Sequence, residues 1–461
     1  MTHAAPLHVA IMAAGKGTRM RSAVPKVLHP LAGRTLLGHV IAALAPLQPQ
    51  QTLVIVGHQH EAVTAALPAG ATAVRQEPQL GTGHALMQVK PVLPPDSGTL
   101  LLLSGDVPLI RPETLTRLVA HHQEQQAAAT ILTTRMPVPG HLGRILRGPG
   151  EAVEAIVEAK DAKPEQLMID EINAGIYCFD WAKVSPLLAQ LQPNNAQGEY
   201  YLTDVIAMLV AAGEPVRAVI TPDWTEVMGI NDRVELAAAG TVLQTRINTG
   251  WMQAGVSLID PATTYIDATV RFEGEATVWP GCLIQGGSVI GDGAEIGPQS
   301  QIRDSLIGAR TLVRQSVIDQ SRIGAGTQVG PFAHLRQHAD VGADCRIGNF
   351  VELKKTVFAD KAKASHLSYL GDATVGTGAN IGAGTITCNY DGAKKHPTTI
   401  GERVFVGSNS VLVAPVTLQA DSYIAAGSVI TQDVPTGALG VGRGRQANIE
   451  GWVWRRRGQE S

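Results

Sequence analysis

A group of small and cationic residues follows the first apolar run of the chain, residues 9–12. It reads Ala13-Ala14-Gly15-Lys16-Gly17-Thr18-Arg19. Small residues after a strand let backbone N–H groups approach phosphate oxygens, and Lys16 and Arg19 add cationic donors. The order matches neither the P-loop nor the dinucleotide Gly-x-Gly-x-x-Gly fingerprint. By spacing alone, the segment is therefore either a phosphate-binding loop or a sharp turn.

A second group of residues whose side chains could take part in catalysis surrounds His366. Lys354 and Lys355 precede it, and Tyr369 follows it within three residues. Acyl transfer to an amine requires a base, because an ammonium group cannot attack, and His is the side chain best matched to that task near neutral pH. A lone His is more often structural, but these neighbours favour a general base.

The elements that must position the first group form an α/β pattern up to about residue 230. Short β-type runs at residues 9–12, 53–56, 100–103 and 130–133 alternate with amphipathic helical stretches. This alternation predicts βαβ units and a mostly parallel, Rossmann-like sheet. The run at 100–103 is continuously apolar, as expected for a strand buried on both faces. Residues 231–254 then show helical periodicity and predict a linking helix.

The elements around His366 follow a different period. Aliphatic or Phe residues recur at every sixth position, at Ile266, Phe272, Val278, Ile284, Ile290, Ile296 and Ile302, and again at Ile400, Val406, Leu412, Leu418, Ile424 and Ile430. A six-residue period is the hexapeptide signature of a parallel β-helix, whose tight turns need small residues. The polar segment 385–399 interrupts the period, and repeat proteins often carry such insertions on the binding face.

The charge and composition of the chain argue against several classes of protein. A formal net charge of −3 over 461 residues gives no reason to expect nucleic acid or an anionic membrane as a partner. The N-terminus lacks the pattern of a signal peptide, and no apolar run could span a bilayer. Four scattered cysteines, Cys178, Cys282, Cys345 and Cys388, favour reduced thiols over disulfides or a zinc site. We therefore expect a cytoplasmic protein.

The N-terminal segments resemble sugar-1-phosphate nucleotidyltransferases. The resemblance rests on residues 13–20, Pro25-Lys26-Val27-Leu28, Leu80-Gly81-Thr82-Gly83-His84-Ala85, Ser104-Gly105-Asp106-Val107-Pro108-Leu109, and shorter matches at 143–145, 156–158, 171–175 and 229–231. It implies that Arg19 and Lys26 act in catalysis on phosphates, and that Asp106 and Asn231 ligate Mg²⁺. It further implies substrate contacts from Met12, Ala13, Ala14, Gly15, Lys26, Gln76, Gly81, Thr82, Ser104, Gly105, Asp106, Gly143, Glu158, Asn173 and Asn231. Gln76, Gly81 and Thr82 would hold uracil, and Gly143, Glu158 and Asn173 the sugar.

The residue types suit that chemistry. Attack of a sugar phosphate on the α-phosphorus of UTP gathers negative charge, which cations and a hard metal ion with oxygen ligands can offset. Because a sugar phosphate is already an anionic nucleophile, we expect positioning and electrostatics to dominate.

The C-terminal half resembles hexapeptide-repeat acyltransferases, whose β-helices are left-handed and commonly form trimers with active sites between subunits. Segments such as Gly348-Asn349-Phe350-Val351-Glu352, Lys363-Ala364-Ser365-His366 and residues 379–392 resemble, more closely, bifunctional N-acetylglucosamine-1-phosphate uridyltransferases/glucosamine-1-phosphate N-acetyltransferases. This resemblance covers nearly the whole chain and makes His366 the general base. It implies contacts to the amino-sugar phosphate from Arg336, Lys354, Tyr369 and Asn380. Acetyl-CoA would contact Ala383, Asn389, Tyr390, Ser408, Ala426 and Arg443, and Glu352 would partner the amine or the base.

The chain departs from that family's pattern near the acetyl site. His334 stands where Arg is usual, Gln337-His338 where Pro-Gly is usual, and Gly444-Arg445 follows Arg443 where a Pro-Gln pair would be expected. Cys388, beside the interrupting loop, is interpreted as an unactivated thiol.

The resulting prediction is a bifunctional enzyme with four segments. Residues 1–230 form a uridylyltransferase domain, 231–254 a linking helix, 255–443 a left-handed β-helix acetyltransferase domain and 444–461 a tail. Its substrates would be glucosamine-1-phosphate, acetyl-CoA, N-acetylglucosamine-1-phosphate and UTP, with Mg²⁺ as cofactor and a homotrimer as the assembly. Two alternatives are a nucleotidyltransferase whose β-helix only oligomerises, and a binding protein that keeps both folds without catalysis.

Overall fold

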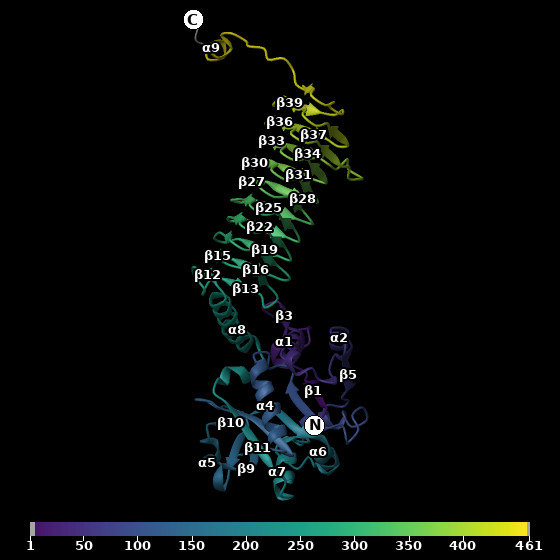
Figure 1. Ribbon diagram of the computed structural model, residues 1–461, viewed down its shortest axis with the longest axis vertical. Helices are drawn as coiled ribbons and strands as arrows, with labels where there is room; N and C mark the ends of the chain where they lie inside the picture. Colours follow the sequence, from purple (N-terminus) through teal and green to yellow (C-terminus); the bar gives the residue numbers. More distant parts are fainter. Residues whose placement is uncertain (1–4, 459–461) are drawn as a thin grey trace. The chain divides into compact units, whose positions relative to one another are not determined.

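The chain divides into two compact units between Leu243 and Gln244 in a computed structural model that describes residues 5–458 (Figure 1). The division falls inside helix α8 (Arg233–Gln253), within the predicted linking segment 231–254. Residues 1–4 and 459–461, the outer ends of the predicted first domain and tail, lie outside the described residues. None of the helices between residues 5 and 458 has the length and apolar character needed to cross a membrane.

The first unit is built on a nine-stranded sheet whose main path runs β11-β7-β10-β6-β1-β4-β5. Its strands are β1 (Leu7–Ala13), β4 (Gln51–Val56), β5 (Ala71–Arg75), β6 (Thr99–Ser104), β7 (Ala129–Arg135), β8 (Arg144–Arg147), β9 (Val153–Val157), β10 (Glu171–Asp180) and β11 (Val216–Thr221). Along the main path only β10 runs antiparallel to its neighbours β6 and β7. A small separate hairpin joins β2 (Pro30–Leu31) to β3 (Arg34–Thr35). The sheet is therefore mostly parallel, as predicted.

Helices cover both faces of this sheet. The α-helices between β3 and β11 are α1 (Leu36–Ala42), α2 (His60–Ala65), α3 (Thr82–Met87), α4 (Pro112–Glu124), α5 (Pro164–Leu167), α6 (Trp181–Leu187) and α7 (Thr203–Ala211), and α5 contributes no buried residue. Along β6, Leu100 and Leu102 join the core cluster that includes α3, α6 and α7, while Leu101 and Leu103 join the cluster that includes α1, α2 and α4. Successive side chains of a strand point to opposite faces, so an unbroken apolar run fits a strand covered on both sides.

The pairing of β1 with β6 determines where the first site lies. The two strands are parallel, and Met12 at the end of β1 is opposite Ser104 at the end of β6. The segments that follow both strands therefore leave the sheet at the same edge, which is where ligands bind in open α/β sheets.

The second unit consists of three parallel sheets that the chain visits in turn, so that successive coils stack on one another (Figure 1). The first sheet holds β12 (Val256–Leu258), β15 (Ala276–Val278), β18 (Ala294–Ile296), β21 (Leu312–Val313), β24 (Gln328–Val329), β27 (Arg346–Asn349), β30 (Lys363–His366), β33 (Asn380–Ile381), β36 (Phe405–Val406), β39 (Tyr423–Ile424) and β41 (Leu439–Gly440). The second holds β13 (Tyr265–Ile266), β16 (Leu283–Gln285), β19 (Gln301–Arg303), β22 (Val317–Asp319), β25 (His334–Arg336), β28 (Glu352–Lys354), β31 (Tyr369–Gly371), β34 (Ile386–Cys388), β37 (Val411–Val413) and β40 (Val429–Ile430). The third holds β14 (Arg271–Phe272), β17 (Val289–Ile290), β20 (Leu306–Ile307), β23 (Arg322–Ile323), β26 (Asp340–Val341), β29 (Val357–Phe358), β32 (Ala373–Val375), β35 (Thr398–Ile400) and β38 (Val416–Leu418).

The six-residue period corresponds to the core of these coils. Its aliphatic members, for example Ile284, Ile290 and Ile296, are fully buried inside the β-helix. Phe272, in the first coil, is only half-buried and packs against Trp251 of α8, with ring centroids 4.9 Å apart. The end of α8 therefore covers the open end of the apolar core.

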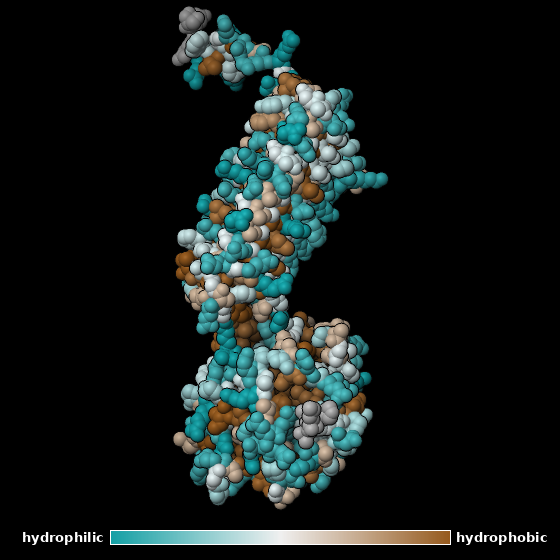
Figure 2. Space-filling view, in the orientation of Figure 1, coloured by the Kyte–Doolittle hydropathy of each residue, from teal (hydrophilic) through white to brown (hydrophobic). Residues whose placement is uncertain are grey.

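The interruption of the coils is shorter than the predicted segment 385–399, because Ile386–Cys388 and Thr398–Ile400 form strands β34 and β35. The residues between β34 and β35 leave the coil as a loop, and the tail carries a short helix, α9 (Trp452–Arg456). All four cysteines are unpaired, and only Cys388 is exposed. On the face shown in Figure 2, apolar residues of the coils appear as separate spots among hydrophilic ones.

The close approach of successive coils generates a stability prediction. A Cβ atom added at Gly308 would lie 2.6 Å from the backbone nitrogen of Ala325 in the next coil. Because that neighbour is backbone and cannot rotate away, Gly308→Ala should lower the free energy of unfolding by about 2 kcal/mol, the usual cost of overpacking. Urea unfolding of the full chain followed by circular dichroism measures this change. Gly287→Ala is the matched control, since its nearest new contact is 3.9 Å away. Equal stability of the two variants would contradict the prediction.

Candidate active sites

A cleft opens at the edge of the sheet where β1 and β6 end. It consists of two adjoining cavities of about 290 and 310 Å³ that share Met12, Thr82, Ser104 and Asp106. The first cavity is also lined by the predicted residues Ala13, Ala14, Gly15, Lys26, Gln76 and Gly81. The second is lined by the predicted residues Arg19, Gly143, Glu158, Asn173 and Asn231. Gly105 lies outside both linings, and its backbone N–H donates to the carbonyl of Met12 (2.9 Å).

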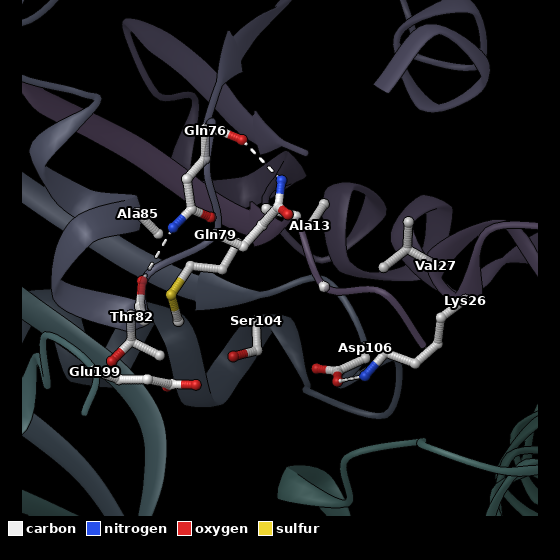
Figure 3. A pocket seen from close by; sticks show the side chains of 14 residues that line it. Ala13, Lys26, Val27, Gln76, Gln79, Thr82, Ala85, Ser104, Asp106 and Glu199 are labelled. Atoms are coloured by element: carbon white, nitrogen blue, oxygen red, sulfur yellow. Dashed lines mark hydrogen bonds and ion pairs between the residues drawn. The ribbon is translucent and has the colours of Figure 1, made fainter. Parts of the chain in front are cut away.

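Lys26 lies between the two predicted metal ligands. Its ammonium group forms an ion pair with Asp106 and donates a hydrogen bond to Oδ1 of Asn231 (3.2 Å). Figure 3 shows Lys26 and Asp106 pointing toward each other at one end of the first cavity. The backbone N–H of Ile230 donates to the carbonyl of Asp106 (2.9 Å), so the segment carrying Asn231 is fastened to the end of the β6 segment.

The donor set here suits a magnesium ion. A carboxylate and an amide oxygen share one nitrogen partner, so both oxygens converge on one region of the cleft. Magnesium prefers oxygen ligands and is usually bound by one or two protein groups, with phosphates and water completing the shell. Within residues 5–458 there is no cluster of three His, Cys, Asp or Glu side chains that could hold a metal by themselves. The residues present therefore fit a metal that binds together with a phosphate substrate.

The first cavity has a preformed rim. Gln76, which is buried, donates through Nε2 to the carbonyl of Gly81 (3.1 Å) and contacts Nδ1 of His84 (3.2 Å). Gly81 has φ +112°, and a Cβ there would lie 2.7 Å from the carbonyl oxygen of Tyr200. The hydroxyl of Thr82 accepts a hydrogen bond from the backbone of Leu202 (3.1 Å). The loop predicted to hold uracil is thus fixed by contacts to the segment around residue 200.

The second cavity contains the three residues predicted to hold the sugar. The backbone N–H of Asn173 donates to the carbonyl of Gly143 (2.9 Å), and its side chain donates to the hydroxyl of Tyr177 (2.6 Å). Glu158 accepts a hydrogen bond from Thr203 (3.4 Å). Burial raises the pKa of Glu158, and the carboxylates of Asp161 and Asp204 raise it further, while the Thr203 bond opposes the shift.

Several lining residues escaped the sequence reasoning. Gln79 and Glu199 line the first cavity, and Tyr177 and Thr203 line the second. Glu199 reaches the cleft because the side chain of Asn195 clamps its backbone, donating to its carbonyl (2.5 Å) and accepting from its N–H (3.2 Å). The segment from 195 to 203 is distant in sequence from the phosphate loop, so no spacing signal connected them.

In the second unit, His366 has a defined partner at the end of β30. Asn349 of β27 is its neighbour in register, and Nδ1 of His366 donates to Oδ1 of Asn349 (2.6 Å). An amide oxygen can only accept, so the proton resides on Nδ1 and Nε2 is left free to act as a base. Glu352 has another partner in this structure. Its carboxylate instead accepts two hydrogen bonds from Arg336 (2.8 and 2.5 Å).

Three residues predicted to contact acetyl-CoA lie on the same corner of the β-helix as His366. Successive pairs Ala364–Ile381, Ile381–Val406 and Val406–Ile424 are in parallel register. Ala383, Ser408 and Ala426 each lie two residues after Ile381, Val406 and Ile424, just as His366 lies two residues after Ala364. These residues therefore stack above His366, one per coil, with a spacing of roughly 4.8 Å between neighbouring strands. Arg443 reaches the last of them, because its guanidinium donates to the carbonyl of Ala426 (2.7 Å).

Cationic residues gather beside this corner on the second sheet. Arg336 pairs in register with Lys354, which is buried, and Glu352 pairs with Tyr369. Lys395, from the interrupting loop, contacts Lys354, and this neighbouring ammonium lowers the pKa of Lys395. Phosphate is the kind of ligand that such closely spaced cations favour. Asn380 is the exception among the predicted phosphate contacts, since it pairs with Lys363, three residues before His366.

The interrupting loop is held by its own polar groups. Asn389 is buried and donates to Asp372 (2.5 Å), while Tyr390 is 60% exposed and donates to the carbonyl of Gly392 (2.6 Å). The backbone N–H of Lys394, the side chain of His396 and the backbone N–H of Ala393 lower the pKa of Asp391. The loop therefore presents Tyr390 to solvent from a rigid turn.

Three of the departures from the family pattern lie about two coils before His366, because His334 pairs with Glu352, which in turn pairs with Tyr369. Gln337 and His338 both have positive φ, 52° and 68°, in a turn that follows Arg336. His334 and His338 lie near Asp319, whose pKa is lowered chiefly by its hydrogen bond from Arg303. Gly444, in the tail, is exposed, and a Cβ atom added there would meet no atom within 4 Å.

Together, a nucleotidyltransferase-like α/β unit with a cation-lined cleft and a hexapeptide β-helix with an exposed histidine define a two-domain transferase. Residues 9–172 match the MobA-like NTP transferase domain. Residues 320–355 match the bacterial transferase hexapeptide and 397–432 the hexapeptide repeat of succinyl-transferase. The chain is 52% identical to the bifunctional protein GlmU of Nostoc sp. over 98% of its length and 99% of that protein's. It is 46% identical to that of Brevibacillus brevis over 96% of both chains.

The chain belongs to the GlmU family of bifunctional proteins. The predicted fold class, a Rossmann-like unit followed by a hexapeptide left-handed β-helix, is confirmed, as is the prediction of a bifunctional enzyme. Among solved structures, a UDP-glucose pyrophosphorylase complexed with UDP-glucose matches 52% of the chain and 99% of its own, with a TM-score of 0.43 at 13% identity.

The raised pKa of Glu158 generates a prediction with opposite effects on stability and binding. Since the folded state holds this proton more tightly than the unfolded state, stability falls as the pH rises from the unfolded pKa to the folded pKa, and the full cost remains above the folded pKa. Glu158→Gln should therefore raise the unfolding midpoint of the chain at pH 7, and the gain should disappear toward about pH 4, where wild-type Glu158 is protonated. The same variant should raise the KM for the sugar phosphate about tenfold, because a charged acceptor is lost.

Thermal unfolding from pH 7 to 4 and steady-state kinetics measure both effects. Glu154→Gln, which neutralises an exposed carboxylate on the same strand β9, is the matched control. A stability gain that persists unchanged at low pH would show that the carboxylate charge is not its cause.

The bond between Asn349 and His366 generates a second prediction. Without this acceptor the imidazole can rotate and populate the wrong tautomer, so Asn349→Ala should lower kcat for acyl transfer by about tenfold or more. Uridylyl transfer should stay at the wild-type rate. The control is Gln328→Ala, which removes an exposed side-chain amide on β24, two coils before the strand that carries His366. An unchanged acyl-transfer kcat in Asn349→Ala would mean that the bond does not orient the base.

Proposed function

We propose that this chain makes UDP-N-acetylglucosamine in two steps. The β-helix unit acetylates glucosamine-1-phosphate with acetyl-CoA, and the α/β unit couples the product to UTP and releases pyrophosphate. The observation that carries the proposal is the position of His366, with Nε2 free, on the corner that also bears Ala383, Ser408 and Ala426 and beside the cations Arg336 and Lys354. In this proposal the base and the coenzyme contacts lie along one corner of the β-helix, and the anion site lies on the neighbouring sheet.

The acetyl step needs a neutral amine. Nε2 of His366 takes a proton from the amino group as its nitrogen attacks the thioester carbonyl, the C–S bond breaks, and the coenzyme thiolate leaves and takes up a proton. Arg336, Lys354, Tyr369 and Asn380 bind the sugar phosphate. Ala383, Asn389, Tyr390, Ser408, Ala426 and Arg443 bind acetyl-CoA.

The uridylyl step needs charge neutralisation more than proton transfer. A phosphate oxygen of N-acetylglucosamine-1-phosphate attacks the α-phosphorus of UTP, and the bond to pyrophosphate breaks. Arg19 and Lys26 offset the charge on the phosphates, Gln76, Gly81 and Thr82 hold uracil, and Gly143, Glu158 and Asn173 hold the sugar. Asp106 and Asn231 would ligate Mg²⁺, which supplies Lewis-acid stabilisation of the phosphates when bound. Met12, Ala13, Ala14, Gly15, Ser104 and Gly105 form the backbone and wall around them.

A homotrimer through the β-helix is part of this proposal. Within one chain, Asn380 pairs with Lys363, which lies three residues before His366. In this proposal the Asn380 that contacts the sugar phosphate therefore comes from a neighbouring subunit. Exposed aromatic pairs on the outside of the coils, Phe332 with Phe350 (5.4 Å) and Phe405 with Tyr423 (4.4 Å), give a subunit interface apolar surface to bury. The unpaired cysteines fit a reducing, cytoplasmic location. The domains proposed are 1–230, 231–254, 255–443 and 444–461.

The first test supplies wild-type protein and Mg²⁺ with each substrate pair in turn. Thiol release from acetyl-CoA with glucosamine-1-phosphate, and pyrophosphate release from UTP with N-acetylglucosamine-1-phosphate, are both expected. Pyrophosphate without thiol would reduce the β-helix to a structural module.

Single variants then separate the two sites. His366→Ala should lower acetyl transfer by at least about 100-fold and spare uridylyl transfer, and Asp106→Ala should do the reverse. Loss of both activities from one substitution, in a chain that still unfolds cooperatively at the wild-type midpoint, would contradict independent sites.

A further inference from the structure

Lys26 occupies the position at which the two predicted metal ligands converge. Its ammonium group forms an ion pair with Asp106 and donates to Oδ1 of Asn231 (3.2 Å). The side chains of Lys26 and Asp106 are only 12% and 23% exposed, so this pair is largely shielded from water. An ammonium in contact with both oxygens fills the direction from which a metal ion would bind them, since magnesium lies only about 2.1 Å from its ligands.

The backbones of the two ligands have little freedom to move away from Lys26. The carbonyl of Asp106 accepts from the N–H of Ile230 (2.9 Å), and the N–H of Asn231 donates to the carboxylate of Glu235 (2.6 Å). Glu235 is itself held at the start of α8 by its own backbone N–H, which donates to Asp232 (2.9 Å). The Lys26 side chain, which extends from the short 3-10 helix η2 (Lys26–Leu28), is therefore the part able to change position.

We propose that Lys26 acts as a placeholder cation that keeps divalent metal out of the Asp106–Asn231 pair until nucleotide binds. The triphosphate of the nucleotide supplies a new partner for the ammonium, which turns away and leaves both oxygens to the metal. Metal and nucleotide then bind cooperatively, although neither alone has a complete site. This inference rests on the proposed uridylyltransferase function and adds to it the order in which charge enters the cleft.

The electrostatic reasoning is direct. A divalent cation beside Asp106 would share one carboxylate with the ammonium of Lys26, and two like charges within a few ångströms in a shielded cleft repel strongly. A bound triphosphate reverses the balance, because it brings several negative charges that both cations can share. By linkage, the factor by which nucleotide raises metal affinity equals the factor by which metal raises nucleotide affinity.

The experiment measures Mn²⁺ binding to the full chain by electron paramagnetic resonance, without and with a non-hydrolysable UTP analogue. Wild type should bind Mn²⁺ weakly alone and much more tightly with the analogue. Lys26→Met keeps the length of the side chain and removes its charge, so its affinity for Mn²⁺ without nucleotide should rise about tenfold, and its coupling to the analogue should fall by a similar factor. Equal nucleotide-free affinities of Lys26→Met and wild type would overturn the proposal.

Three further variants make the result specific. Lys26→Arg keeps the charge and should retain weak nucleotide-free binding, whereas tight binding by this variant would overturn the proposal. Lys16→Met removes an exposed cation of the loop that follows β1 and should leave nucleotide-free Mn²⁺ affinity unchanged. Asp106→Ala should lose Mn²⁺ binding with the analogue present. If Asp106→Ala binds Mn²⁺ as wild type does, the proposed metal site itself is wrong, an outcome distinct from failure of the placeholder role alone.

Discussion

Both candidate sites depend on the register of parallel strand pairing. In the first unit, the pairing of Met12 with Ser104 brings the segments after β1 and β6 to one edge of the sheet. In the second, the pairing of Asn349 with His366 and its continuation through later coils aligns residues about one coil apart on a single corner. A shift of one residue in either register would turn these side chains to the opposite face, because side chains alternate along a strand.

Each region proposed to bind phosphate pairs a cation with a carboxylate. Lys26 contacts Asp106 in the cleft, and Arg336 contacts Glu352 beside the β-helix corner. Such pairs keep long cationic side chains in place and offset the cost of partial burial. A phosphate that binds there must replace the carboxylate as the partner, so part of its attraction to the cation is offset. The gain is selectivity for ligands with enough charge to make that exchange.

Most of the architecture follows from patterns that a single chain displays. The continuous apolar run at 100–103 predicts a doubly covered strand, and the buried Ile284, Ile290 and Ile296 follow directly from the six-residue period. The partner of His366 does not follow in this way. Asn349 lies 17 residues before it, and only coil stacking makes the two adjacent, so Glu352 was the more obvious candidate from charge alone. The position of Glu199 in the cleft could not be predicted for the same reason, because it depends on the hydrogen bonds that the side chain of Asn195 makes to its backbone.

The amino-acid sequence by itself determined the two fold classes, the family and the residue types available for phosphate and acyl chemistry, because periodicity and local motifs are properties of neighbours along the chain. Only the tertiary structure decided which of those residues touch. It placed Lys26 between Asp106 and Asn231, which lie 80 and 205 residues away along the chain, and it separated Asn380 from the corner that carries His366. Contacts across such separations are set by strand order and packing, and no local pattern encodes them.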